Sequence, residues 1–448
     1  MLTFKNFRLR QHLIYFFCAF ILISQNTYSA EVSTQRKNLS KAIESKNTAL
    51  AKSIVEKNKI PVDELSEGSE TPLMEAAYIA NLDLVRYFIK KGADVNFNDT
   101  EGYKKTPIQQ AIATFWTKND DTVSSIIQEL VNAGARVNKK ITSWQPSAFM
   151  EACKEGAVKC VKVFIKAGVD LEAKTSQGNT ALMFAVENGK DEVTSILLQN
   201  KVNTESKDSQ GKTALLYSIQ KGSPSLVNLL IGAGAKSDVK DANGTTAYMY
   251  ALASGVNTLK ELFFQLTKDF KTLNNENQSV LFFVARSNDV QTASYFINQG
   301  LKINQKDKDG STPLLEAANA NQTDMVRFFI ENGADMKLVD NKGMSAVYAA
   351  AKNLNLDMLQ LLLDKKAPID HPYEYGITPI MRGIIDNNFE VFVRLRNAGA
   401  NIKARTTQTL TITMLFPYGR YEVPTQTSVV DLAKILKRTD MIQVLSKN

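Results

Sequence analysis

The hydrophobic and polar positions of this chain recur along its length with a step of 33 residues. The clearest unit runs from Gly310 to Asp340; it opens with GSTPLLEAA and closes with FFIENGADMKLVD. Steps of 33 from its threonine reach a serine or threonine each time, namely Ser147, Thr180, Thr213, Thr246, Ser279, Thr312, Ser345 and Thr378. A period of this length predicts a stacked array of short structural repeats.

Each unit predicts two short helices joined by a turn. Thr312 can cap the first helix with its hydroxyl, and Pro313 suits the first helical position because no amide partner is needed there. Gly333 ends the second helix, since a left-handed C-cap favours glycine. Apolar and small residues at helical spacing predict the faces that meet: Leu314, Ala317 and Ala318 in the first helix, and Met325, Val326, Phe329 and Ile330 in the second.

These segments resemble a known repeat family. TPLLEAA, MVRFFIENGAD and the 33-residue step are similar to the ankyrin repeat, and Thr71–Ala77 (TPLMEAA) with Lys91–Asp94 (KGAD) repeats the match. The resemblance covers nearly all of the chain after residue 38. It implies an all-α solenoid of about 11–12 helix–turn–helix repeats with projecting hairpin loops. It also implies protein binding but no particular ligand, because the family is defined by its scaffold.

The N-terminal end of the array and its middle depart from the regular pattern. Residues 31–70 predict a degenerate N-terminal capping repeat with a polar outer face, which an array needs to stay soluble; regular repeats follow over 71–404. The repeat that starts at Thr246 is the weakest, with Thr267 where glycine is expected, and Lys201 and Lys366 also replace the C-cap glycine. These departures predict lower local stability.

The C-terminal end contains an insertion. Within residues 405–427, Thr409–Phe416 alternates with period two, Pro417–Arg420 supplies a turn, and Tyr421–Val423 returns. This pattern predicts a β-hairpin inserted before the last repeat. Residues 428–448 then predict a C-terminal capping repeat.

Residues 1–30 have the pattern of a secretory signal peptide. Lys5, Arg8 and Arg10 precede the apolar run Leu13–Ile23, and a polar segment ends in small residues, so cleavage is expected after Ser29 or Ala30. The run is shorter than the ~20 residues that span a bilayer, so we expect no stable membrane insertion after cleavage. An uncleaved anchor is the alternative. The pattern predicts a periplasmic or secreted protein.

Charge and histidine content narrow the classes of function. The formal net charge is +8; without the three basic residues of positions 1–30, which include no acidic residue, it is 51 minus 46, or +5. So mild an excess, spread over a long surface, argues against a nucleic-acid partner. His12 belongs to the signal peptide, which leaves His371 alone after cleavage. We therefore predict no catalytic residue, no metal ligand and no cofactor.

Two groups of residues keep alternative interpretations. Glu75, Glu151 and Glu316 share one repeat position and form either an acidic stripe or an ordinary solvated helix surface. Cys153 and Cys160 fall on the facing sides of one helix pair, so they are either small buried hydrophobic residues or, in an oxidising compartment, a disulfide.

The family resemblance places the partner-facing side on the hairpin tips and on the exposed face of the first helices. The candidates there are Tyr78, Ile79, Lys154, Glu187, Lys221, Arg286, Lys352, Tyr373 and Tyr375, to which the hairpin turn adds Tyr418. The main hypothesis is a non-enzymatic, exported bacterial scaffold that binds another protein on its concave face. The alternatives are an inhibitor or immunity protein that occludes an exported enzyme with the hairpin, and a cell-envelope enzyme that uses carboxylates.

Overall fold

A computed structural model describes residues 31–66, 68–98, 105–113, 115, 120–138, 146–414 and 419–446. The chain divides into two compact units. The first unit contains residues up to Ser209 together with Thr213–Ser218 and Ser225–Ala235, and the second contains Gln210–Lys212, Ile219–Pro224 and the residues from Lys236 onward. The predicted signal peptide, residues 1–30, lies outside the described residues.

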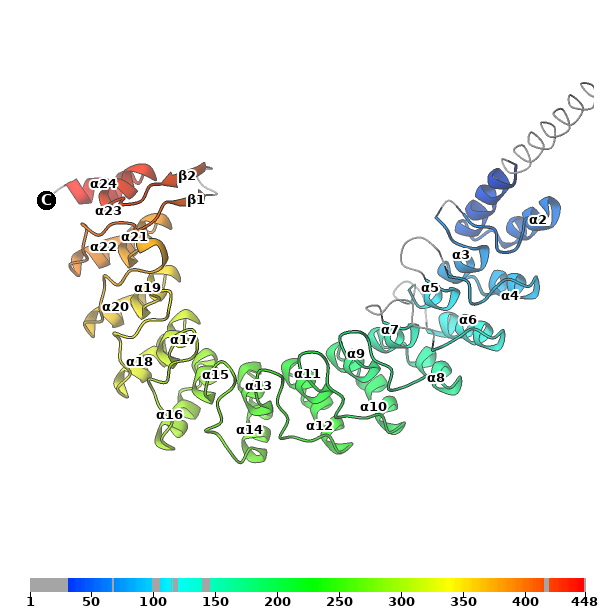
Figure 1. The fold of residues 1–448 in the computed structure, drawn as a ribbon, viewed down its shortest axis with the longest axis horizontal. Helices are drawn as coiled ribbons and strands as arrows, with labels where there is room; N and C mark the ends of the chain where they lie inside the picture. Colours follow the sequence, from blue (N-terminus) through cyan, green and yellow to red (C-terminus); the bar gives the residue numbers. More distant parts are fainter. Residues whose placement is uncertain are drawn as a thin grey trace, which may run out of the picture. The chain divides into compact units, whose positions relative to one another are not determined.

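The first unit is a stack of antiparallel helix pairs. First helices pack on first helices of the next repeat, as α3 on α5 and α7 on α9, while second helices form a parallel row, as α4 on α6 and α6 on α8 (Figure 1). Its helices are residues 31–44, α2 (Thr48–Asn58), α3 (Pro72–Tyr78), α4 (Leu82–Lys90), α5 (Pro107–Ala113), α6 (Asp120–Asn132), α7 (Ala148–Glu155), α8 (Val158–Lys166), α9 (Ala181–Glu187) and α10 (Asp191–Gln199).

The second unit repeats this architecture, and α11 (Ala214–Gln220) and α12 (Pro224–Gly232) lie where the sequence passes from one unit to the other. Its first helices are α13 (Ala247–Ser254), α15 (Val280–Ser287), α17 (Pro313–Asn319), α19 (Ala346–Lys352), α21 (Pro379–Ile385) and α23 (Val429–Ile435). Its second helices are α14 (Asn257–Leu266), α16 (Val290–Asn298), α18 (Thr323–Glu331), α20 (Leu356–Asp364), α22 (Phe389–Asn397) and α24 (Thr439–Ser446). The predicted helix–turn–helix repeats are confirmed.

Local sequence sets the helix ends as expected. The Thr312 hydroxyl accepts the amide of Leu315 at 3.3 Å and Pro313 occupies the first turn of α17. Gly333 follows α18 with φ of 89°. The same left-handed position is filled by Lys201 at φ 58° and Lys366 at φ 59°, where a side chain costs about 1 kcal/mol relative to glycine.

In the repeat that starts at Thr246, the chain continues from the end of α14 without the left-handed C-cap of the other repeats. At Thr267 the chain is extended, with φ of −88° and ψ of 126°, so no glycine is needed there. The segment after it brings Phe270 against Phe264, Tyr248 and Tyr295, with ring centroids 5.3–6.4 Å apart. Tyr248 is 1% exposed and its hydroxyl has no hydrogen-bond partner among the described residues. The irregular repeat therefore contains an aromatic cluster.

The predicted β-hairpin is present. β1 (Leu410–Met414) pairs antiparallel with β2 (Gly419–Val423), with Leu410 opposite Val423 and Thr413 opposite Arg420. Leu410 and Ile412 alternate with the exposed Thr411 and Thr413. β2 contacts α23, which fixes one side of the hairpin on the last helix pair.

The base of the hairpin is fastened to the preceding loop tip. A short 3-10 helix, η2 (Glu374–Gly376), forms this tip, and the Thr407 amide donates to the carbonyl oxygen of Tyr375 at 2.8 Å. Gly376 has φ of 77°, and a Cβ atom there would lie 2.7 Å from the Thr407 nitrogen. A glycine is required at this close approach.

Candidate protein-binding clefts

The predicted partner-facing residues lie at one end of successive first helices and on the loop tips. Nine of the ten lie in the described part of the chain, and Tyr418 lies outside it. Glu187, Lys221, Arg286 and Lys352 are exposed, one in each of four repeats, whereas Lys154 and Ile79 are half-buried. The structure gathers two subsets into clefts, Tyr78 with Ile79 in the first unit and Tyr373 with Tyr375 in the second.

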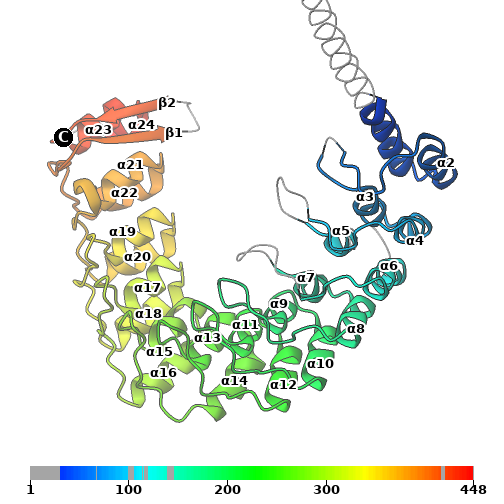
Figure 2. The ribbon, with the colours of Figure 1, turned by 45° about the vertical axis from the view of Figure 1, so that its right-hand side comes forward.

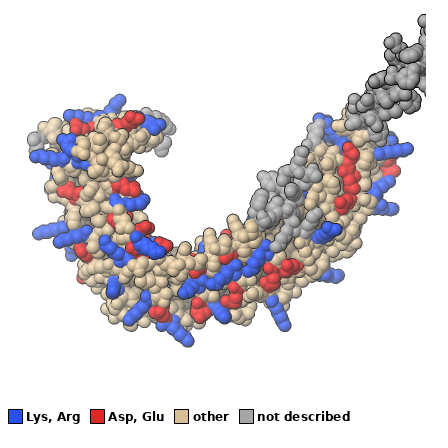
Figure 3. All heavy atoms as spheres, in the orientation of Figure 1, with Lys and Arg blue, Asp and Glu red and all other residues tan. Residues whose placement is uncertain are grey.

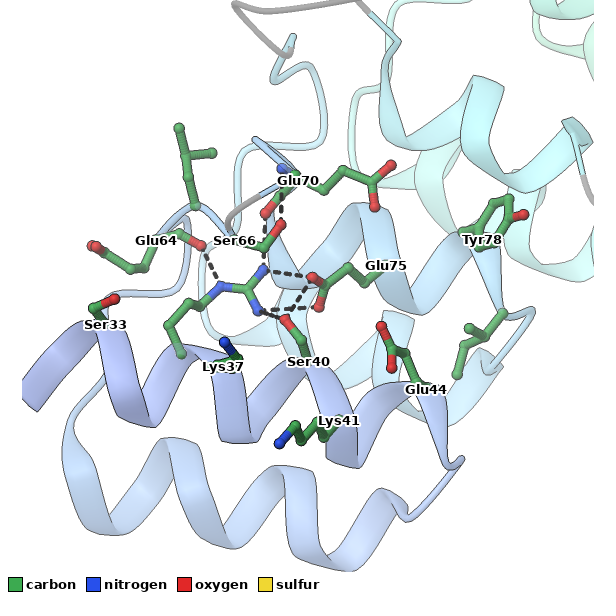
Figure 4. A pocket seen from close by; sticks show the side chains of 14 residues that line it. Ser33, Lys37, Ser40, Lys41, Glu44, Glu64, Ser66, Glu70, Glu75 and Tyr78 are labelled. Carbon is green, nitrogen blue, oxygen red and sulfur yellow. Dashed lines mark hydrogen bonds and ion pairs between the residues drawn. The ribbon is translucent and has the colours of Figure 1, made fainter.

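The cleft of the first unit lies between the helix at residues 31–44, the loop between α2 and α3, and α3 itself, and has a volume of about 620 Å³. Tyr78, 50% exposed, lies at its rim, while Ser40 and Glu75 point toward one another inside it (Figure 4). The Ser40 hydroxyl donates to Glu75 Oε1 at 2.8 Å and accepts from Arg36 Nη1 at 2.6 Å.

Arg36 holds this end of the stack together. It is 2% exposed, and five oxygens lie within 3.1 Å of its guanidinium: both carboxylate oxygens of Glu75, the Ser40 hydroxyl and the carbonyls of Glu64 and Glu70. A guanidinium has five N–H groups, so this one is fully used inside the protein. This cluster therefore stabilises the fold, and Tyr78 is the exposed aromatic side chain that a partner could contact at this cleft.

The cleft of the second unit has a volume of about 600 Å³ and is bounded by the η2 loop tip, α21 and β1. The rings of Tyr348 and Tyr373 are in contact, tilted by 33° with centroids 4.7 Å apart. Tyr375 is 48% exposed and adopts φ of 61°, an uncommon conformation for a residue other than glycine. The Thr407 amide bond to its carbonyl holds that conformation, so the aromatic side chain is presented from a fixed backbone.

Two arginines that the sequence analysis did not single out complete this cleft. Arg382 makes a bidentate pair with Asp386 at 2.6 and 2.7 Å, and Arg438 donates to the carbonyl oxygens of Ile384 and Ile385 at 3.1 and 3.2 Å. Arg382 and Asp386 are four residues apart on one helix, a spacing that could have indicated their pairing from sequence. Arg438 gave no such signal because its acceptors lie more than fifty residues earlier.

The protonation states of the cleft suit recognition at neutral pH. Burial raises the pKa of Tyr348 and of Tyr373, so both remain neutral phenols that can donate hydrogen bonds. Burial acts to lower the pKa of Arg382, but the adjacent Asp386 carboxylate outweighs it and the pKa is raised. The cleft therefore combines aromatic surface with a fixed positive charge that is already paired.

Both cysteines of the predicted mature chain lie in the interior of the first unit. Cys153 and Cys160 are buried free thiols, and no disulfide joins them. The Cys160 sulfur lies 3.2 Å from Asp120 Oδ1 of the preceding repeat, so it is a hydrogen-bond donor to a neighbouring helix pair. Burial raises the pKa of both thiols, which keeps them protonated. In this structure both residues pack as small buried side chains, and a disulfide between them stays a prediction for an oxidising compartment.

Glutamates at the shared repeat position are paired. Glu75 binds Arg36, Glu151 lies 3.4 Å from Lys154, and Glu316 lies 2.8 Å from Arg286. On the face shown in Figure 3, basic and acidic side chains are interspersed over each unit. Among the described residues there is no cluster of His, Cys, Asp and Glu that could hold a metal ion, and no helix with the length and hydropathy to cross a bilayer.

Comparison with known families agrees with the fold. The model of the family described as ankyrin repeats (3 copies) matches residues 39–141, 117–208, 195–271, 249–340 and 316–406. The chain belongs to the ankyrin-repeat family. Ankyrin repeats form protein–protein interaction domains, so this ankyrin-repeat protein has the scaffold of a binding domain.

Two individual proteins illustrate the similarity. Over 119 residues the chain is 32% identical to the ankyrin repeat and KH domain-containing protein mask-1 of Caenorhabditis elegans, which is 27% of this chain and 4% of that protein. The chain thus spans a small part of that relative's length. The crystal structure of the human ASB11 ankyrin repeat domain is 22% identical, with a TM-score of 0.42, and the alignment covers 50% of this chain and 99% of that one.

Proposed function

We propose that this ankyrin-repeat protein is a non-enzymatic binding protein, exported from the cytoplasm of a bacterium, that captures a protein partner on the face formed by its first helices and loop tips. The principal contact is the cleft of the second unit, which is bounded by the η2 loop tip, α21 and β1. The observation that carries the proposal is the exposed Tyr375 side chain beside a 600 Å³ cleft, on a backbone fixed by Thr407.

Physical reasons favour this cleft as the centre of an interface. Tyrosine and arginine are enriched among residues that dominate binding energy, because they bury much surface at little cost in conformational entropy. Here the Tyr348 side chain already contacts Tyr373 and Arg382 in the free protein. Binding therefore costs these side chains little further conformational entropy. The first-unit cleft offers one exposed aromatic residue, Tyr78, and is better described as a secondary contact.

A photo-crosslinking experiment tests the binding site. The photoreactive amino acid p-benzoylphenylalanine replaces Tyr375 or, as a control, Phe389, an aromatic residue of α22 with similar exposure at 44%. Irradiation of the native host should link a defined protein to position 375 and not to position 389. Absence of any product specific to position 375 would count against the proposed cleft.

Export is supported by the pattern of residues 1–30. Expressed in a Gram-negative bacterium, the full chain should be recovered from the periplasmic fraction with residues 1–29 or 1–30 removed, as read by intact mass. Full-length protein confined to the cytoplasmic fraction would refute export. A periplasmic chain of full-length mass would instead indicate an uncleaved anchor.

A further inference from the structure

The edge of β1, rather than one of its faces, borders the cleft of the second unit. Leu410, Thr411, Ile412 and Thr413 all line the cleft, although alternate side chains of a strand point to opposite sides. Four consecutive residues line one space when the backbone edge of the strand faces it. β2 occupies the other edge and contacts α23, and in both ribbon views β1 is the strand nearer α21 (Figures 1 and 2).

This edge has hydrogen-bonding groups that the protein does not use. In an antiparallel pair, alternate residues direct their amide and carbonyl groups away from the partner strand. Within the described part of the chain, no backbone group of Leu410–Met414 bonds to anything except β2. The outward groups of β1 are therefore unpaired at the cleft.

The two edges of the hairpin differ in composition. β2 carries the charged residues Arg420 and Glu422 and is followed by Pro424, which are the devices by which proteins discourage further strand pairing. β1 has the sequence LTITM, without charge or proline, and its residues favour strands. The protected edge lies away from the cleft and the unprotected edge faces it.

We infer that an extended segment of the partner protein adds to β1 as a third strand. This inference rests on the proposed function and specifies its binding mode. Free amide and carbonyl groups at strand spacing are matched by another extended backbone, and neither a helix nor a compact small molecule offers that repeat. Five residues of β1 give room for a segment of about five residues, roughly 17 Å long.

The same geometry defines the side chains that the segment carries. Alternate side chains of the added strand face the body of the unit, where Tyr373, Tyr375 and Ile385 line the cleft. The segment therefore has apolar or aromatic residues at every second position and tolerates polar residues between them.

Peptides provide the test. Eight-residue peptides are selected from a random display library on the purified chain lacking residues 1–30, and binders are resynthesised with one backbone amide methylated at a time. Methylation should weaken binding at least about tenfold at every second position and change it less than twofold between them. Sensitivity that follows side-chain identity with no period of two would overturn strand addition.

Protein variants give an independent readout. Thr411→Lys with Thr413→Lys places charges along the β1 edge and should abolish peptide binding, whereas Glu422→Lys, on the residue opposite Thr411, should leave binding unchanged. In hydrogen exchange, the bound peptide should protect alternate amides of β1. Unchanged exchange in β1, or equal loss of binding in the Glu422→Lys control, would overturn the inference.

The outcomes separate binding mode from function. If crosslinking at position 375 captures a partner but neither the methylation pattern nor the β1 protection appears, the proposed function stands and strand addition is wrong. If no partner is captured at position 375, the proposed cleft itself fails. Concentration-dependent self-association that the β1 lysines abolish would show that a second copy of this chain occupies the edge instead, and would overturn the partner segment.

Discussion

Replacing Arg36 by methionine should loosen the N-terminal end of the first unit. Methionine keeps much of the side-chain length but removes every donor, so the Glu75 carboxylate, 9% exposed, is left without its cation. Removing one partner of a buried ion pair typically costs 3–5 kcal/mol. Because Glu75 keeps the Ser40 hydroxyl as a donor, we expect a value near the lower end, about 3 kcal/mol.

Hydrogen exchange measured by mass spectrometry reports this loss of stability separately for each segment of the chain. In a repeat array each unit contacts mainly its neighbours, so the helix at residues 31–44 should exchange about a hundredfold faster in the variant while α17–α20 stay unchanged. Destabilisation of about 3 kcal/mol corresponds to that factor, since 1.4 kcal/mol is tenfold.

A double variant separates the ion pair from general packing. Arg36→Met combined with Glu75→Leu removes both charges, and an apolar pair of similar volume can be as stable as the original. The double variant should recover more than half of the lost protection. Exchange in the double variant that equals or exceeds that of Arg36→Met would refute the reasoning, as would less than a threefold effect of Arg36→Met.

Three further predictions concern single positions. Lys201→Gly and Lys366→Gly should each raise the free energy of unfolding by about 1 kcal/mol, seen as a higher urea midpoint. Both lysines have a left-handed backbone conformation, which glycine adopts without the steric cost of a side chain. Tyr248→Phe should raise it by about 1 kcal/mol by removing a buried hydroxyl without a partner; a loss instead would show that the hydroxyl is satisfied. Burial acts to raise the pKa of Asp289, but bonds from Lys260 and the first turn of α16 outweigh it and lower the pKa below 3.8. Its stabilising effect is fully present above the unfolded pKa and is lost as pH falls through the lower folded pKa. Asp289→Asn should therefore cost about 1 kcal/mol at pH 7 and progressively less as the pH is lowered below 3.8 in urea titrations.

The repeat fold was predictable because each signal is local. Thr312, Pro313 and Gly333 act on helix ends within a few residues, and the 33-residue step fixes where the next pair begins. The same logic placed Tyr373 and Tyr375 on a loop tip. The 33-residue period and a few capping residues were thus sufficient to predict most of the architecture.

The composition of the clefts was not predictable from the same signals. Arg438 reaches Ile384 across fifty-four positions, and the Thr407 bond to Tyr375 depends on where the hairpin lies, which no repeat period encodes. Arg36 belongs to a segment that reads as a polar outer face, yet it is buried because a later loop supplies carbonyl acceptors. Non-local contacts of this kind require coordinates.

The affinity of the captured partner for Tyr375 variants tests the central claim most directly. Isothermal titration calorimetry compares the unmodified protein with Tyr375→Ala and with Phe389→Ala, its control of similar exposure on α22. A central aromatic anchor is worth about 2 kcal/mol or more, so Tyr375→Ala should raise Kd about thirtyfold while Phe389→Ala changes it less than twofold. Equal affinities for Tyr375→Ala and the unmodified protein would contradict the account.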